Sequence, residues 1–275
     1  MNFNLGCQLN YSIEDSSIFV FHIAVTATQT QTIKTEEISI DPPLNLEEYL
    51  LPNVRNRYLR LTAPAGTLKV GYRATVDVTY LEETPNLIPE VPINKLPLEV
   101  FPYLYPSRYC ESDRLIRFAQ QEFGDLLPGY SRVNAICNWI YDNVIYLFGS
   151  SNPHTSAYDT ATERAGVCRD FAHLGITFCR ALNIPARFVA GYAYGLEPPD
   201  FHACFEAYLG HRWYLFDATR LVPRKGLIRI GVGRDAADVS FATIFGAAQM
   251  DDMALFVEVE GEEPPSFSTN AIRSH

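Results

Sequence analysis

The chain has 275 residues, of which 47% are apolar, and its formal net charge at pH 7 is −10. This length suits one large domain or two ordinary ones, and the apolar fraction is enough for a sizeable core. The acidic balance disfavours nucleic-acid binding, because neutralising phosphates requires a basic face. We therefore expect no nucleic-acid partner.

The spacing of the cysteines and the first ten residues of the chain indicate the cellular compartment of the protein. The six cysteines form no Cys-x-x-Cys pair, which argues against a disulfide scaffold and against a zinc ribbon. The first ten residues lack the basic and apolar regions of a signal peptide. The apolar segment 18–27 is too short to span a bilayer. We expect a cytoplasmic protein with no membrane contact.

Residues 1–82 are predicted to form a β-rich domain. Apolar side chains occupy every second position from Leu68 to Tyr80, which is typical of a strand with one buried face. The segment 57–63 and the turn Pro64–Gly66 come just before it, so a hairpin is expected. Together with strands at 15–28 and 34–41, these segments predict a small antiparallel sandwich or sheet.

Residues 83–108 are predicted to be a linker, because they hold six of the 18 prolines and proline disrupts helices and central strands. Four helices are expected after it. Their segments are 112–124, capped by Ser112, then 131–147, then 156–164, ending near Gly166, and finally 168–182.

Strands are expected next, at 186–194, 202–209, 212–218, 226–232 and 254–260. Helices followed by neighbouring strands favour an α+β fold over a doubly wound parallel sheet. We assign residues 109–262 to this core and 263–275 to a C-terminal tail.

Cys168 follows Gly166-Val167 and opens the fourth predicted helix. A helix N-terminus carries unsatisfied N–H groups and partial positive charge, which favour a thiolate over a thiol. The alternative is a small buried apolar residue, which is a common role of free cysteine. We expect that role for the other cysteines, with Cys204 discussed below.

Two residues on consecutive strands could activate this thiol. If the loop between the strands is Gly210-His211 alone, His202 faces Thr219 and Asp217 lies diagonally across from His202 on the same face. A carboxylate would then hold an imidazole beside the thiol, giving nucleophile, base and orienting group.

His173 is a weaker candidate for the base. It lies five residues after Cys168, so on a helix it points about 140° away. We expect it to pack or to make hydrogen bonds behind the site.

The segments "RAGVCRDFAHLGITFCRALNIPARFVAGY" and "HACFEAYLGHRWYLFDATR" resemble the core of transglutaminase-like cysteine enzymes, particularly bacterial ones. The resemblance covers roughly residues 113–238, and residues 1–82 are similar to the β domain that often precedes this core. It implies a transglutaminase-like, papain-like α+β core in which Cys168 is the nucleophile, His202 the base and Asp217 the orienting acid.

The chain departs from the family pattern at two positions. Cys204 stands where the family has tryptophan, and Ala218 stands where it has proline. Cys204 is expected to fill space in its strand, with a resolving thiol for Cys168 as the alternative. A metal site using Cys168, Cys204, His202 and Asp217 matches no zinc spacing, so neither metal nor cofactor is expected.

The resemblance implies a thiol amidase or peptidase that acts on a peptide or protein amide through a thioester. Two alternatives remain. One is a protein-glutamine acyltransferase that passes the acyl group to an amine, and the other is a non-catalytic binding module on the same fold.

Overall fold

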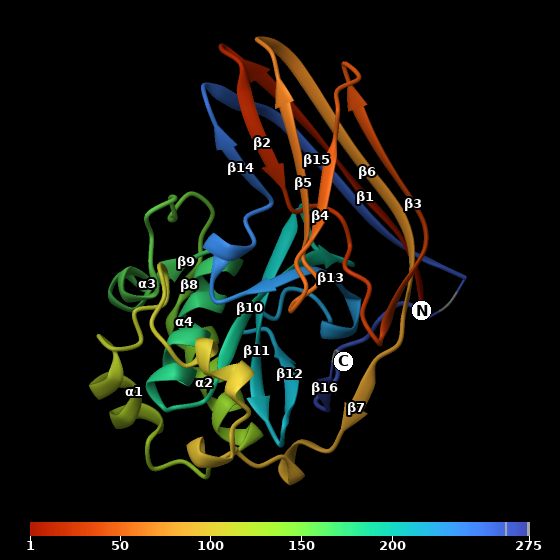
Figure 1. The fold of residues 1–275 in the computed structure, drawn as a ribbon. Helices are drawn as coiled ribbons and strands as arrows, with labels where there is room; N and C mark the ends of the chain where they lie inside the picture. The colour runs from red at the N-terminus through yellow and green to blue at the C-terminus, as the bar shows by residue number, and fades with distance from the viewer. Residues whose placement is uncertain (262, 274–275) are drawn as a thin grey trace.

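The computed structural model describes residues 1–261 and 263–273. It consists of a β-sandwich, at the top of Figure 1, and an α+β core, which lies below the sandwich in that view. The α+β fold class expected from the order of elements is confirmed.

The sandwich is built from two four-stranded antiparallel sheets. One sheet has the order β15-β1-β6-β3, with β15 Ala248–Glu260, β1 Asn2–Ile13, β6 Gly66–Val78 and β3 Gln31–Asp41. The other has the order β14-β2-β5-β4, with β14 Ala242–Phe245, β2 Ser17–Phe21, β5 Arg57–Ala63 and β4 Glu47–Leu50. Alternate side chains of the strands fill a shared core, in which Tyr11 packs edge-on against Phe19.

The expected hairpin between 57–63 and 67–80 is wrong, because β5 and β6 belong to opposite sheets. The turn passes through Gly66 at φ +134°, a conformation that favours glycine. Each strand has one apolar face, and placing the two strands in facing sheets buries both faces against each other.

Two strands from late in the sequence complete the sandwich. β15 pairs with β1 and β14 pairs with β2, both antiparallel. Our expected division assigned residues up to 262 to the core, whereas these strands belong to the sandwich sheets (Figure 1).

The core contains a six-stranded sheet with the order β13-β10-β11-β12-β16-β7. Its strands are β13 Leu227–Gly233, β10 Ala186–Ala193, β11 Phe201–Leu209, β12 Arg212–Phe216, β16 Ala271–Arg273 and β7 Leu81–Glu83. β16 lies between β12 and β7, so part of the expected C-terminal tail is a sheet strand.

Four helices form the other layer of the core, and they lie to one side of the sheet in Figure 1. They are α1 Ile116–Phe123, α2 Tyr130–Asn143, α3 Ala157–Glu163 and α4 Cys168–Ala181. α4 rests on β11, where Gly175 leaves room for the Phe205 ring: a Cβ at this glycine would lie 2.5 Å from a ring carbon. Glycine therefore lets α4 approach the sheet closely.

Three helix boundaries differ from expectation. α1 begins at Ile116, because residues 112–115 form a tight turn in which Leu115 N–H donates to Ser112 O at 3.3 Å. α2 ends at Asn143, and residues 145–146 of the expected helix form the strand β8 Ile145–Tyr146. α3 ends at Glu163, because the next residue, Arg164, takes φ +58°. Gly166 belongs to the two-residue strand β9 Ala165–Gly166, which pairs in parallel with β8.

The proline-rich stretch forms three short 3₁₀ helices, η1 Pro85–Leu87, η2 Ile93–Lys95 and η3 Leu98–Tyr103. Val91, Leu96 and Val100 from this stretch pack against Tyr208 of β11 and Trp213 of β12. It thereby covers part of the core sheet.

The sandwich and the core are joined by buried polar contacts. The Gln31 side chain donates to the Arg229 carbonyl and accepts from the Arg229 N–H, both at 2.8 Å. Asn56 makes the same pair of bonds with the backbone of Val232. These bonds hold β13, which is the edge strand of the core sheet and pairs with β10. The sandwich therefore stabilises the β13 edge of the core sheet.

Candidate active site

The predicted nucleophile Cys168 is the first residue of α4 and is partly exposed, whereas the other five cysteines are buried. The turn before it is held by Asp170, whose carboxylate accepts the Val167 N–H at 2.9 Å. Gly166 permits this bond, because a Cβ there would lie 2.7 Å from the Asp170 Cβ. The local sequence therefore fixes the thiol at the positive end of a helix.

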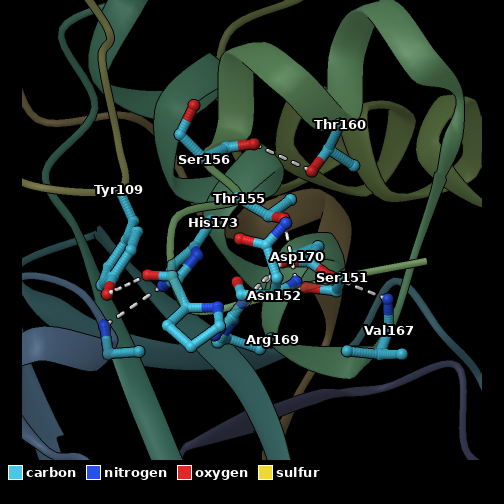
Figure 2. Close-up of polar contacts among 12 residues, drawn as sticks. Tyr109, Ser151, Asn152, Thr155, Ser156, Thr160, Val167, Arg169, Asp170 and His173 are labelled. Carbon is cyan, nitrogen blue, oxygen red and sulfur yellow. Dashed lines mark hydrogen bonds and ion pairs between the residues drawn. The ribbon is translucent and has the colours of Figure 1, made fainter. Parts of the chain in front are cut away.

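Arg169 ties this helix start to the loop before α3. Its guanidinium donates to Ser151 Oγ at 2.6 Å and to the Asn152 carbonyl at 2.7 Å, and it lies 3.3 Å from the Asp170 carboxylate. Figure 2 shows these groups gathered at the start of α4. These bonds hold the loop before α3 against the start of α4.

His202 and Asp217 meet at the ends of β11 and β12. The His202 Nε2 atom lies 2.8 Å from Asp217 Oδ2. The other oxygen, Oδ1, accepts from the Thr219 N–H at 2.9 Å and from its hydroxyl at 2.7 Å. The carboxylate is therefore held from both sides and is fixed beside the imidazole.

The strand register that brings them together agrees with the prediction from sequence. Leu209 pairs with Arg212, and the two-residue loop between the strands has positive φ at both Gly210 and His211. Such a turn matches the twist of paired strands. Because no bulge interrupts the pairing, Asp217 emerges diagonally opposite His202.

The electrostatics of the pair favour a charged imidazole. Burial opposes the imidazolium, but the charge and hydrogen bond of Asp217, joined by those of the Cys168 thiol, raise the pKa of His202 to about 10. Burial likewise opposes the carboxylate, yet His202 and Thr219 keep the pKa of Asp217 below its ordinary value. An imidazolium–carboxylate pair therefore persists at neutral pH beside the thiol.

The second ring nitrogen of His202, Nδ1, is buried and has no hydrogen-bond partner among the described residues. The Cys168 thiol is close enough to act on this imidazole and helps to raise its pKa. His202 and Asp217 are therefore in contact, with Cys168 near the imidazole.

Two further residues at the site were missed from the sequence. The Tyr146 side chain lies next to Cys168, and the charge of Asp200 acts on both Tyr146 and His202. Burial raises the pKa of the Asp200 carboxyl. Tyr146 lies on the two-residue strand β8, which is too short for a periodic pattern, so the sequence carries no local signal for it.

A cavity of about 420 Å³ reaches Asp217 from the side of α2. Asn134 and Asn138 of α2 line it, together with Arg220 and Arg224 from the segment after β12. This volume falls in the lower part of the range typical of small-ligand pockets. It gives solvent and small molecules access to the neighbourhood of the carboxylate.

The environments of His173 and Cys204 indicate structural roles. His173 Nε2 accepts the Ala236 N–H at 3.1 Å, and burial lowers the pKa of His173 well below its ordinary value, so the ring is neutral. Its ring stacks on Tyr109 with centroids 5.0 Å apart. Cys204 packs among buried apolar side chains, and burial raises its pKa.

Glu206 is fully buried and paired with two arginines. Its carboxylate lies 2.7 Å from Arg187 Nε and also binds Arg229.

Comparisons with known proteins identify the family of this chain. Residues 117–218 match the sequence model of the transglutaminase-like superfamily, and residues 1–99 match that of the bacterial transglutaminase N-terminal domain. The first of these ranges contains Cys168, His202 and Asp217.

A solved structure shows the same fold over the whole chain. It is the crystal structure of a protein from Cytophaga hutchinsonii described as a "putative cysteine protease". The two chains are 44% identical, the match covers 100% of this chain and 98% of the other, and the TM-score is 0.96. An uncharacterised protein of Mycobacterium leprae is 26% identical over 211 residues, which is 72% of this chain and 75% of the relative.

Proposed function

Because this chain belongs to the transglutaminase-like superfamily, with the N-terminal domain of bacterial transglutaminases, we propose that it is a thiol amidase or peptidase. Cys168 would attack the carbonyl of a peptide or protein amide, with His202 as acid and base and Asp217 as the orienting group. The observation that carries the proposal is the 2.8 Å bond between His202 and Asp217 beside a thiol that opens a helix.

The chemistry follows from the charges at the site. With His202 protonated, the Cys168 sulfur attacks as a thiolate, and a C–S bond forms while the carbonyl π electrons move to oxygen. When this intermediate collapses, the C–N bond breaks and the imidazolium gives its proton to the departing amine. A thioester and a neutral imidazole remain.

Water completes the cycle in the hydrolytic reaction. The neutral imidazole takes a proton from water as the oxygen attacks the thioester, and the thiolate leaves, which restores the starting ion pair. Transfer to an amine would use the same thioester with the amine in place of water. The likeness to a protein described as a cysteine protease favours hydrolysis as the leading function.

Thiol labelling tests the nucleophile. Iodoacetamide should alkylate Cys168 near neutral pH much faster than the buried cysteines, because burial raises the pKa of Cys7 to about 11 and that of Cys110 to about 12. Peptide mapping by mass spectrometry identifies the modified residue. His202→Gln should slow this labelling, whereas Cys110→Ser should leave it unchanged.

The same proteins test the thioester. p-Nitrophenyl acetate should leave one acetyl group on the native chain and none on Cys168→Ser. Labelling spread equally over the accessible thiols, or acetylation that persists in Cys168→Ser, would refute the proposal and favour a binding module on this fold.

We include a cytoplasmic location in the proposal. All six cysteines are free thiols, which suits a reducing compartment. None of the helices in the described residues has the length and hydropathy needed to cross a membrane.

A further inference from the structure

β8 brings a tyrosine beside the start of α4. Tyr146 is paired in register with Gly166, two residues before Cys168, and Leu147 N–H donates to Gly166 O at 3.0 Å. The Tyr146 ring lies 5.7 Å from the Phe171 ring, one turn into α4. Strand pairing and ring packing therefore fix this phenol against the first turn of the helix.

The Tyr146 hydroxyl lies near both parts of Cys168 that matter for attack on a carbonyl, the backbone N–H and the thiol, and both act on the phenol. The side chain is half-buried, so one side of this group stays open to an incoming molecule.

Attack by Cys168 creates a negative oxygen that needs donors. The N–H of the residue that opens the helix is the natural first donor, because it points out of the helix end and lies close to the newly bonded carbon. A carbonyl oxygen that accepts this N–H must therefore lie close to the side chain that packs beside the helix start, which is Tyr146.

We propose that Tyr146 is a catalytic residue whose hydroxyl is the second hydrogen-bond donor to the oxyanion formed at Cys168. This inference rests on the proposed function. In the free enzyme, the hydroxyl lies beside the Cys168 N–H. When the carbonyl oxygen arrives it accepts that N–H, and the phenol O–H turns to donate to the same oxygen. No proton is transferred in this exchange.

The surroundings keep the phenol in its donor form. Burial first, and then the charge of Cys168, raise the pKa of Tyr146 well above its ordinary value, and the Asp200 carboxylate acts in the same direction. The group therefore stays protonated across the working range of pH. It can donate to a developing charge, and it cannot act as a base.

Two reactions of the same thiol test the assignment. Acylation by p-nitrophenyl acetate passes through an oxyanion, whereas alkylation by iodoacetamide displaces iodide and forms none. Tyr146→Phe should slow acylation by about 10²-fold, the usual cost of losing one oxyanion donor. It should leave the rate and pH profile of alkylation close to native.

Tyr109→Phe is the matched control, because the Tyr109 hydroxyl donates to the Pro153 carbonyl at 2.9 Å. It should leave both reactions unchanged. Melting temperatures of both variants should match the native protein, since each loses only a hydroxyl.

The outcomes separate this inference from the proposed function. Native-like acylation in Tyr146→Phe would overturn the oxyanion assignment. An equal fall in acylation and alkylation would overturn it too, because the hydroxyl would then act on the thiol itself. If the native protein reacts with neither reagent at Cys168, the proposed function fails instead.

Discussion

Each oxygen of the Asp217 carboxylate has its own partner, His202 on one side and Thr219 on the other. A group held in this way can fix both the tautomer and the orientation of the imidazole. It also supplies the charge that keeps His202 protonated. The carboxylate therefore has a geometric role and an electrostatic role.

Asp217→Asn separates these roles. The amide nearly preserves the shape but removes the charge, so we expect acylation of Cys168 to fall by at least about tenfold, less than the roughly 10⁴-fold loss in a serine protease. Charge from Asp217 raises the pKa of His202, so its loss should shift the basic limb of the pH profile downward from near pH 10. Single-turnover acylation across pH measures both effects.

Melting temperature serves as the control for that substitution. Unchanged acylation would remove Asp217 from the mechanism. A large fall in melting temperature would instead identify it as a structural anchor of the β12 end.

Residues with a strong chemical signature could be predicted from the sequence, and the others could not. The contact between His202 and Asp217 was predictable because strand alternation and a two-residue turn fix which side chains share a face. Cys168 was predictable as the first residue of its helix. Tyr146 could not be found in this way. Its position depends on a parallel pair between β8 and β9, each only two residues long.

At the scale of elements, the start of α4 depends on a close approach between Gly166 and Asp170. The missing Cβ of Gly166 lets the Asp170 side chain reach the Val167 N–H. This bond supplies the N-terminal cap, since Val167 has no polar side chain of its own. The position of Cys168 thus depends on Gly166, a residue that has no reactive side chain.

Gly166→Ala tests this dependence. The added methyl group would lie 2.7 Å from the Asp170 Cβ, so we expect a loss of about 1–3 kcal/mol in unfolding free energy, typical of overpacking. The rate of Cys168 alkylation should fall with it, because the helix start must shift. Urea unfolding measures the change in unfolding free energy, and iodoacetamide kinetics measure the rate of Cys168 alkylation.

Gly226→Ala is the comparison. Its Cβ would lie 3.1 Å from the Tyr194 Cβ, in another part of the core. We expect a smaller stability loss and native alkylation. A native alkylation rate in Gly166→Ala would show that the helix start tolerates the shift.

Periodicity predicted most elements but not their partners. The 57–63 and 67–80 strands were correct as strands and wrong as a hairpin, because alternation reveals a buried face and does not reveal which sheet covers it. Ser112 was wrong as a helix cap because a tight turn comes between it and α1. Helix ends depend on such local turns, which a polar residue alone does not distinguish.

At the scale of the molecule, acid stability depends on histidines buried in the neutral form. His22 follows β2, where its N–H donates to the Phe241 carbonyl at 3.0 Å and its ring lies 4.2 Å from the Tyr58 ring. Burial lowers the pKa of His22 to about 4. Folding therefore requires this ring to stay uncharged.

The sign of the effect follows from proton binding. Between pH 6.5 and pH 4 the unfolded chain binds a proton at His22 that the folded chain excludes, so stability falls as pH falls through this window. The shift from 6.5 to about 4 corresponds to roughly 3 kcal/mol. His22→Phe should remove this part of the slope, as measured by urea unfolding from pH 4 to pH 7.

His154→Phe provides the control, because His154 is exposed. Its curve should run parallel to that of the native protein. A His22→Phe curve parallel to the native one would mean that the ring is hydrated or already charged when folded. His173, which is also buried and neutral, should preserve a residual slope in either variant.

The sandwich was predictable only in part. Its early strands follow from alternating side chains, but the pairing of β1 with β15 joins residues about 250 positions apart, as in Leu5 with Val257. Local patterns carry no information on such a pairing. For the same reason, residues 242–260 were expected in the core and are found in the sandwich.

This pairing has a consequence for the order in which the chain is made. As a nascent chain leaves the ribosome, β1 emerges first, and its partner β15 follows only after the segment that carries Cys168, His202 and Asp217. Until then one edge of β1 is open to pairing with other chains, and contacts so distant in sequence form slowly. Completion of the sandwich therefore comes after the candidate site has emerged, and a chain truncated before residue 248 would carry the whole candidate site on a body with an unfinished sheet.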